Sequence, residues 1–296
     1  MISGILFAVI VSVLFAVYAV PRKYSKQNAT LYTMWVGVAY LVGSVVVCSA
    51  VWGLGLREQE NLLSPWHVLT ALRGVVWVCG IVSFNIAIDK IGLTRFNQWK
   101  NFQGPIGTLL MLAFLNEVTG SKVLWLLLGM TAMFISAVLF TIKSDNGSKQ
   151  SNKSGILFAL LAAACFGVTA FINKIITNQG FIYSQLLYHS LSVVVSAAII
   201  FVIQKRKPKE IGRLSRENWL PVISGAMYLT ATILSIFSYT LIAGSVSWSI
   251  TQLNAVWTIL IGIFVFKEVS FKKHWPRIIT GFIFAFVAII LLLKAL

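Results

Sequence analysis

The hydrophobic pattern divides the chain into ten long apolar blocks separated by short polar segments. Each block has about twenty residues, which is the length an α-helix needs to cross the hydrocarbon core of a bilayer. The expected spans cover residues 3–20, 31–54, 66–88, 94–116, 122–142, 154–176, 183–203, 218–241, 244–266 and 275–293. The segments between them are too short for a soluble catalytic domain. The pattern therefore predicts an all-α membrane protein with ten transmembrane helices.

Composition agrees with this prediction, because 58% of the residues are hydrophobic and only 11% are charged. Soluble globular domains have about 45–50% apolar and about 25% charged residues. The net charge of +16, from 24 Lys+Arg against 8 Asp+Glu, would suggest a nucleic-acid partner in a soluble chain. Here the charges lie in short loops between apolar spans, so we expect the lipid bilayer as a partner and no nucleic acid.

The distribution of Lys and Arg predicts an orientation. Most of them lie in the loops after the first, third, fifth, seventh and ninth spans. The positive-inside rule then places these odd-numbered loops in the cytoplasm and both termini outside, in the cell membrane. Cys48, Cys79 and Cys165 each lie inside an apolar block without a CxxC pattern, so no disulfide framework, metal site or cofactor is expected.

The chain repeats itself at an offset of 151 residues. The segment Ser3–Ala8 recurs letter for letter as Ser154–Ala159. Further pairs at the same offset are Phe15 and Phe166, Ala19 and Ala170, Lys23 and Lys174, Tyr32 and Tyr183, Gly74 and Gly225, and Glu117 and Glu268. Each copy holds five spans, and an odd number inverts the second copy in the membrane. We predict two inverted five-helix repeats, 1–144 and 154–296, joined by a cytoplasmic linker, 145–153.

These features resemble the drug/metabolite transporter superfamily with its EamA-type repeats: two five-span halves, an aromatic-rich end to the first span, and Glu117 and Glu268 closing the fourth and ninth spans. Within that superfamily, the segment Ser12–Lys23 together with Trp35 is most similar to the rhamnose and glucose/ribose uptake branch. The resemblance implies solute transport without ATP, and no nucleotide-binding GxxxxGK[ST] loop is present. Small multidrug antiporters carry a glutamate in the middle of the first span, which this chain lacks.

Polar residues inside the fourth and ninth spans are the leading candidates for binding a solute, because polar groups are costly in a membrane unless they have a role. Their amides both donate and accept hydrogen bonds, which suits sugar hydroxyls, and nearby tryptophans can stack on the C–H faces. The alternative is hydrogen bonding between packed helices without solute contact. These candidates are Trp99, Asn101, Gln103, Trp248, Gln252 and Asn254.

Proline and charge add further candidates. Pro105 interrupts the fourth span and removes the usual donor to the carbonyl of Asn101. Arg73 lies seven residues into the third span, where it could bind an anionic group or pair with a polar neighbour. Tyr18 is a further substrate-binding candidate. His189, well inside the seventh span, could exchange protons during transport or be a hydrogen-bonded core residue.

The sequence thus favours a secondary transporter that takes up a small neutral polar solute, preferably a monosaccharide, together with protons, as a monomer or homodimer. The alternative within transport is an exporter of amino acids, other metabolites or drugs. Outside transport, a channel or a structural membrane protein remains. An enzyme is not expected, because HExxH, GxSxG and a convergent carboxylate pair are all missing from the sequence.

Overall fold

Helices form all the regular secondary structure in the computed structural model, which describes residues 1–91, 96, 99–140, 142, 153–204, 219–267 and 270–296. In the first part of the chain the helices are α1 (Ile2–Val17), α2 (Val20–Tyr24), α3 (Ala29–Gly53), α4 (Trp66–Ile91), α6 (Gln103–Leu115) and α7 (Ser121–Leu139). In the second part they are α8 (Lys153–Asn178), α9 (Ser184–Ile203), α10 (Trp219–Leu241), α11 (Gly244–Thr251), α12 (Asn254–Phe264) and α13 (Phe271–Lys294).

The lengths and composition of these helices are those of a multi-span membrane protein. Within the described ranges, nine helical segments are long and apolar enough to cross a bilayer, if α1 is joined with α2 and α11 with α12. α6 is a shorter apolar helix of 13 residues. Large apolar side chains are exposed along the outer faces of the bundle, as expected where lipid replaces water. The predicted fold class is therefore confirmed.

Local sequence sets where several helices begin and end. Asn28 precedes α3, and its side chain accepts a hydrogen bond of 2.8 Å from the backbone N–H of Thr30, which satisfies one of the free donors of the first turn. Asn116 follows α6 in the left-handed conformation, with φ at 51°, a common way to stop a helix. These signals delimit the spans but do not orient them.

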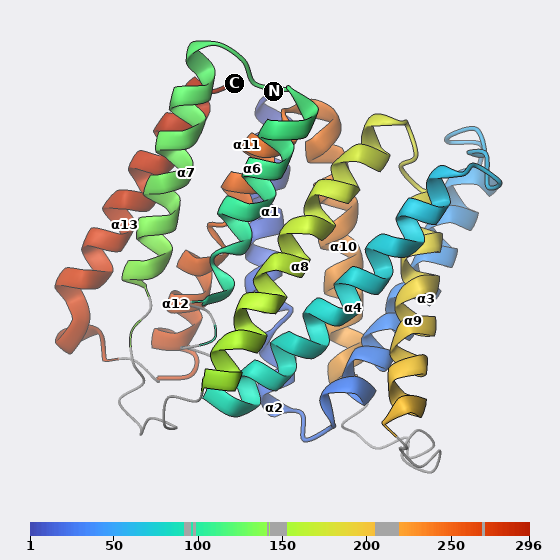
Figure 1. Ribbon diagram of the computed structural model, residues 1–296, viewed down its shortest axis with the longest axis horizontal. Helices are drawn as coiled ribbons and strands as arrows, with labels where there is room; N and C mark the ends of the chain where they lie inside the picture. The colour runs from blue at the N-terminus through green and yellow to red at the C-terminus, as the bar shows by residue number, and fades with distance from the viewer. Residues whose placement is uncertain (92–95, 97–98, 141, 143–152, 205–218, 268–269) are drawn as a thin grey trace.

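The helices pack as one bundle with the chain termini at the same edge (Figure 1). α7 and α13 contact each other at one end of the bundle, and α3 and α9 do so at the other. Between them, α4 packs on α8, α1 on α10, and α6 on both α8 and α11. Lys122 Nζ, at the start of α7, donates to the carbonyl of Leu296 at 2.7 Å, which ties the C-terminus to this edge.

The expected ninth span is not one continuous helix. α11 ends at Thr251 and α12 begins at Asn254, and the N–H groups of Gln252 and Leu253 bond three residues back, to Ser249 and Ile250. Such bonds tighten the helix locally. The side-chain amide of Asn254 donates to the carbonyl of Thr251 at 3.0 Å. The polar side chains of this segment thus satisfy the backbone groups that the break frees.

The expected fourth span is interrupted as well. Trp99 and Lys100 are helical, residues 101–102 form a turn, and α6 begins after it at Gln103. The carbonyl of Asn101, which lacks its usual donor because of Pro105, accepts instead from the N–H of Gly104 at 3.3 Å. Residues 92–95 and 97–98 lie outside the described part of the chain, as does nearly all of the expected linker, since α8 begins at Lys153.

Candidate functional site

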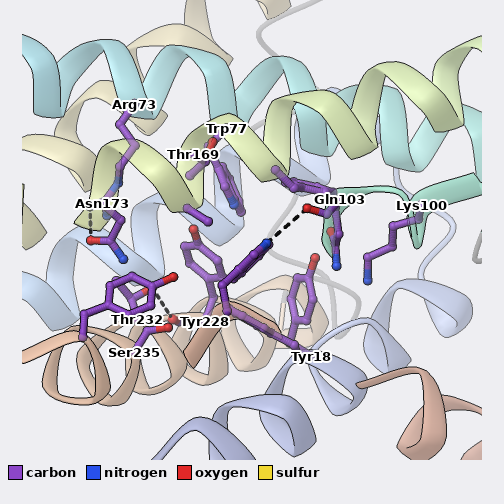
Figure 2. A pocket seen from close by; sticks show the side chains of 15 residues that line it. Tyr18, Arg73, Trp77, Lys100, Gln103, Thr169, Asn173, Tyr228, Thr232 and Ser235 are labelled. Atoms are coloured by element: carbon purple, nitrogen blue, oxygen red, sulfur yellow. Dashed lines mark hydrogen bonds between the residues drawn. The ribbon is translucent and has the colours of Figure 1, made fainter. Parts of the chain in front are cut away.

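A cavity lies in the middle of the bundle and is lined by residues of α1, α4, α6, α8, α10 and α11 (Figure 2). About 600 Å³ of space between its walls, the open mouth included, is not filled by protein atoms. The lining residues are Phe15, Tyr18, Arg73, Trp77, Lys100, Gln103, Phe166, Thr169, Ala170, Asn173, Tyr228, Thr232, Ser235, Tyr239 and Trp248. Their composition is aromatic and polar.

α10 contributes a polar stripe along one face. Tyr228, Thr232, Ser235 and Tyr239 follow one another at intervals of four, three and four residues. In a helix with 3.6 residues per turn, these positions lie on the same side. One helix therefore lines the length of the cavity with hydroxyl groups.

Aromatic rings form the apolar part of the wall. The ring centroids of Trp77 and Tyr228 are 4.6 Å apart, and those of Tyr18 and Tyr228 are 6.1 Å apart. Phe15 stacks beside Tyr228 at 6.3 Å. Rings from α1, α4 and α10 thus meet at the cavity, and aromatic faces of this kind offer flat apolar surface next to polar groups.

Gln103 and Trp248 join the two interrupted spans. The indole Nε1 of Trp248 donates to the carbonyl of Gln103 at 3.1 Å, and the side-chain Nε2 of Gln103 donates to Oε1 of Gln252 at 3.2 Å. The side-chain oxygen of Gln103 has no donor within the described part of the chain. This oxygen is therefore available to accept a hydrogen bond from a solute hydroxyl.

Arg73 is buried in the cavity wall, with 1% of its surface exposed. Its Nη1 donates to Asn173 Oδ1 at 2.6 Å and to Gln185 Oε1 at 2.7 Å, and its Nε donates to His189 Nδ1 at 3.2 Å. All three partners are neutral acceptors. Among the described residues, no acidic side chain forms an ion pair with this guanidinium.

A second buried cation, Lys100, lies at the opposite end of the view from Arg73 (Figure 2). Its ammonium is 5.8 Å from the centroid of the Phe84 ring. Lys100 and Gln103 are neighbours in Figure 2, while Arg73 and Asn173 lie together at the other end. The cavity therefore has two positively charged ends with aromatic and hydroxyl groups between them.

A third buried cation is neutralised by an acid. Lys174 Nζ lies 2.8 Å from Glu117 Oε1 and donates to the carbonyl of Tyr239 at 2.6 Å. Glu117 Oε2 accepts from the backbone N–H of Gly244 at 2.7 Å. These bonds tie the end of α6 to α8 and to the junction between α10 and α11, beside the cavity residues Asn173 and Tyr239.

The candidates from the sequence fall into two groups. Tyr18, Arg73, Gln103 and Trp248 line the cavity. Asn101 and Gln252 instead line a smaller adjacent space, where Asn101 Nδ2 donates to Ala137 at 3.3 Å and Gln252 Nε2 donates to the carbonyl of Trp248 at 3.0 Å.

The other three candidates lie outside both spaces. The side-chain amide of Asn254 donates to the carbonyl of Thr251 at the break between α11 and α12. The ring of Trp99 stacks on Phe102, with centroids 6.3 Å apart. His189 is fully buried behind Arg73, and its Nε2 has no partner among the described residues.

Several cavity residues were not among the sequence candidates, notably Trp77, Phe166, Tyr228, Thr232 and Ser235. The spacing along α10 is a signal that could have found its members. Trp77 lies four residues after Arg73, about one helical turn, so both side chains are on the same face of α4. Aromatic rings inside apolar spans carry no such signal by themselves.

The arrangement defines a class of protein: a helical membrane protein with interrupted spans around a central polar and aromatic cavity, which is the architecture of a membrane transporter. Residues 58–294 match the family model described as "Sugar transport protein", so the chain belongs to this sugar transport family. The fold is also that of a solved crystal structure, with a TM-score of 0.71, 12% identity, and coverage of 98% of this chain and 96% of the other.

Two curated bacterial proteins resemble the chain in sequence. One, of Listeria monocytogenes, is named "Putative sugar uptake protein lmo0169" and is 24% identical over 221 residues, 72% of this chain and 74% of its own length. The other, of Lactobacillus johnsonii, is named "Putative sugar uptake protein" and is 27% identical over 165 residues, 54% of this chain and 51% of its own length. Family and relatives support the coarse conclusion that the chain is a sugar transporter.

Proposed function

We propose that the protein is a secondary carrier that takes up a monosaccharide across the cytoplasmic membrane, and that the sugar binds in the central cavity. The observation that carries this proposal is the composition of the cavity wall in a chain of the sugar transport family. Hydroxyl and amide groups can exchange hydrogen bonds with sugar hydroxyls, while rings cover the apolar C–H faces.

The carrier would consist of two inverted five-helix halves with the cavity between them. Three pairs of cavity residues, one member from each half, correspond at the repeat offset of 151 positions, which supports this arrangement. The corresponding pairs are Phe15 and Phe166, Tyr18 and Thr169, and Trp77 and Tyr228. Equivalent positions that face one cavity from opposite halves are the expected geometry of an inverted-repeat transporter.

Close helix contacts follow the same offset. A Cβ added to Gly4 of α1 would meet Ile242 at 3.0 Å, just beyond α10, and one added to Gly155 of α8 would meet Ile91, at the end of α4. Gly4 and Gly155 are 151 positions apart in the sequence, and so are Ile91 and Ile242. The helix pairs agree as well, because α1 packs on α10 as α8 packs on α4, and α3 packs on α10 as α9 packs on α4.

We further propose that uptake is coupled to protons, with His189 as the coupling residue. The groups around its ring are Arg73 from α4, Tyr40 from α3 and Tyr228 from α10. Arg73 donates to Nδ1, so the ring hydrogen of a neutral His189 sits on Nε2. Any proton taken up at Nδ1 would displace this bond, which would link protonation to the position of Arg73 in the cavity wall.

The orientation proposed for the carrier has odd-numbered loops in the cytoplasm and both termini outside. The charge distribution along the sequence supports it. Rocking of the two halves around the cavity would then expose the sugar first outside and afterwards inside.

Sugar binding to purified protein tests the proposal, because a ligand that binds only the folded state raises apparent stability with its concentration. Thermal-shift titrations with a panel of monosaccharides should give saturable stabilisation. Gln103→Ala should weaken that affinity roughly two- to tenfold, the effect of losing one or two hydrogen bonds. The exposed Gln179 offers a matched control, and Gln179→Ala should bind as the wild type does.

Two results would contradict this account. Stabilisation by amino acids or cationic drugs, with none by sugars, would favour the exporter alternative. Unchanged sugar affinity in Gln103→Ala and in Trp248→Ala would show that the sugar binds elsewhere than in the central cavity.

A further inference from the structure

The cavity wall carries two cations and no acidic side chain. Arg73 and Lys100 are 1% and 7% exposed, and the fifteen lining residues include neither Asp nor Glu. Glu117, whose side chain is 15% exposed, lies beside the cavity residues Asn173 and Tyr239 and is already bound to Lys174 at 2.8 Å. Buried charges are costly in a membrane protein unless they are paired. The electrostatic potential of the cavity therefore favours an anion.

The hydrogen bonds of Arg73 leave part of its guanidinium unused. Asn173, Gln185 and His189 occupy the hydrogens of Nη1 and Nε, so these bonds fix the plane of the group. Within the described part of the chain, no hydrogen bond in good geometry uses Nη2, and the hydroxyl of Tyr40, which has no hydrogen-bond partner of its own, lies beside the guanidinium. A guanidinium held by neutral side chains, with one nitrogen still able to donate, is suited to a carboxylate, because bonds between ionised groups are the strong ones.

Lys100 adds positive potential from the other end of the cavity (Figure 2). Its ammonium has no acid or hydrogen-bond acceptor in the described ranges, and its recorded contact is the ring of Phe84 at 5.8 Å. A neutral sugar would leave both cations without a counter-charge. A solute with one negative group would neutralise Arg73 directly and would be attracted by Lys100 at longer range.

We propose that the solute is an acidic monosaccharide, of the uronate or aldonate class, and that its carboxylate binds Nη2 of Arg73. The hydroxyl groups of the sugar then extend past Trp77 and Tyr228 toward Gln103. This inference rests on the proposed function and narrows it, since it replaces a neutral sugar by its carboxylic acid in the same cavity.

The first test compares ligands on the unmodified protein. Isothermal titration of purified wild-type carrier measures the affinity for D-glucuronate and D-galacturonate, for their neutral amides, and for D-glucose and D-galactose. The acids should bind at least about tenfold more tightly than the amides of the same shape. Equal or tighter binding of the amides or parent sugars overturns the inference and leaves sugar transport standing. If none of these sugars binds, both the inference and the proposed function are contradicted.

A second test assigns the preference to Arg73. Arg73→Gln should bring acid and amide to nearly equal affinity, whereas Arg277→Gln should keep the wild-type preference, because Arg277 lies exposed on α13. Arg73→Lys keeps the charge if the glutamine variant does not fold, and it should retain a reduced preference. A full acid preference in Arg73→Gln would contradict the assignment. If glucose 6-phosphate binds more tightly than either uronate, the proposed carboxylate is contradicted, and the anionic group of the solute is a phosphate instead.

Discussion

α6 and α8 approach each other closely at two glycines, Gly107 and Gly167, and this contact gives a quantitative prediction. A Cβ added to Gly107 would lie 2.7 Å from Cδ1 of Trp248, closer still to its Nε1, and 3.2 Å from the carbonyl of Gly167. Trp248 cannot stay in place against such a Cβ, since real Cβ atoms essentially never come so close to a neighbour. In Gly107→Ala the indole must move, and its bond to the carbonyl of Gln103 must lengthen or break.

The cost of this substitution has three parts. Extra volume in a packed interior costs about 1–3 kcal/mol. Loss of the bond from Trp248 to the carbonyl of Gln103 costs about 1 kcal/mol. Replacing glycine by alanine inside a helix recovers about 0.5–1 kcal/mol of folding free energy. The sum for Gly107→Ala is a loss of about 1–3.5 kcal/mol in stability. Sugar binding should weaken as well, because Trp248 lines the cavity.

Gly262 of α12 provides the matched control, because a Cβ added there meets no atom within 4 Å. Gly262→Ala should therefore raise stability by about 0.5–1 kcal/mol, because alanine favours the helix and no neighbour has to move. At roughly 2 °C per kcal/mol, the apparent Tm of Gly107→Ala should lie about 4–8 °C below that of Gly262→Ala. Both variants are measured in the same detergent at one scan rate, because irreversible unfolding makes the apparent Tm depend on the rate. Equal Tm values for the two variants would refute the packing described here.

Three further predictions concern charge, coupling and orientation. Glu117→Gln leaves the ammonium of Lys174 buried without its carboxylate, so the free energy of unfolding should fall by about 3–5 kcal/mol. In thermal unfolding, the double variant Glu117→Gln with Lys174→Met should recover part of this loss. A double variant less stable than Glu117→Gln alone would contradict the pairing. His189→Gln should abolish sugar accumulation driven by a pH gradient but preserve counterflow, and accumulation that persists would exclude His189 as the coupling residue. Ser148→Cys, in a background without the native cysteines, should react with an impermeant thiol reagent only from the cytoplasmic side, and labelling of intact cells would reverse the orientation.

The sequence predicted the helices well because the bilayer sets their length. Hydrophobic block lengths follow from the thickness of the hydrocarbon core, so even ten spans can be counted along the chain. The break within the ninth span was not predicted, because it depends on which carbonyls the amide groups reach once the helix tightens. Asn254 shows this: its amide bonds to Thr251 in the same segment, a contact that the residue type does not reveal.

The rotation of each helix about its own axis could not be predicted from the sequence either. Spans that are apolar all around carry little periodicity, so the face turned to the cavity cannot be read from hydrophobicity. Arg73, Gln103 and Tyr18 were recognisable because polar groups inside a span need partners, and all three line the cavity. Tyr228 and Trp77 were not predicted, because Trp and Tyr in membrane helices also occur as anchors at the lipid interface. The spacing of polar residues along α10 does mark Tyr228.

The most direct test of the central claim is counterflow of a radiolabelled monosaccharide in proteoliposomes that contain only this protein. A carrier with one cavity between two halves predicts saturable entry of labelled sugar that accelerates when unlabelled sugar is trapped inside, and loss of this acceleration in Gln103→Ala and Trp248→Ala. A flux that rises linearly with concentration and does not respond to trapped sugar would contradict the account and would indicate a channel.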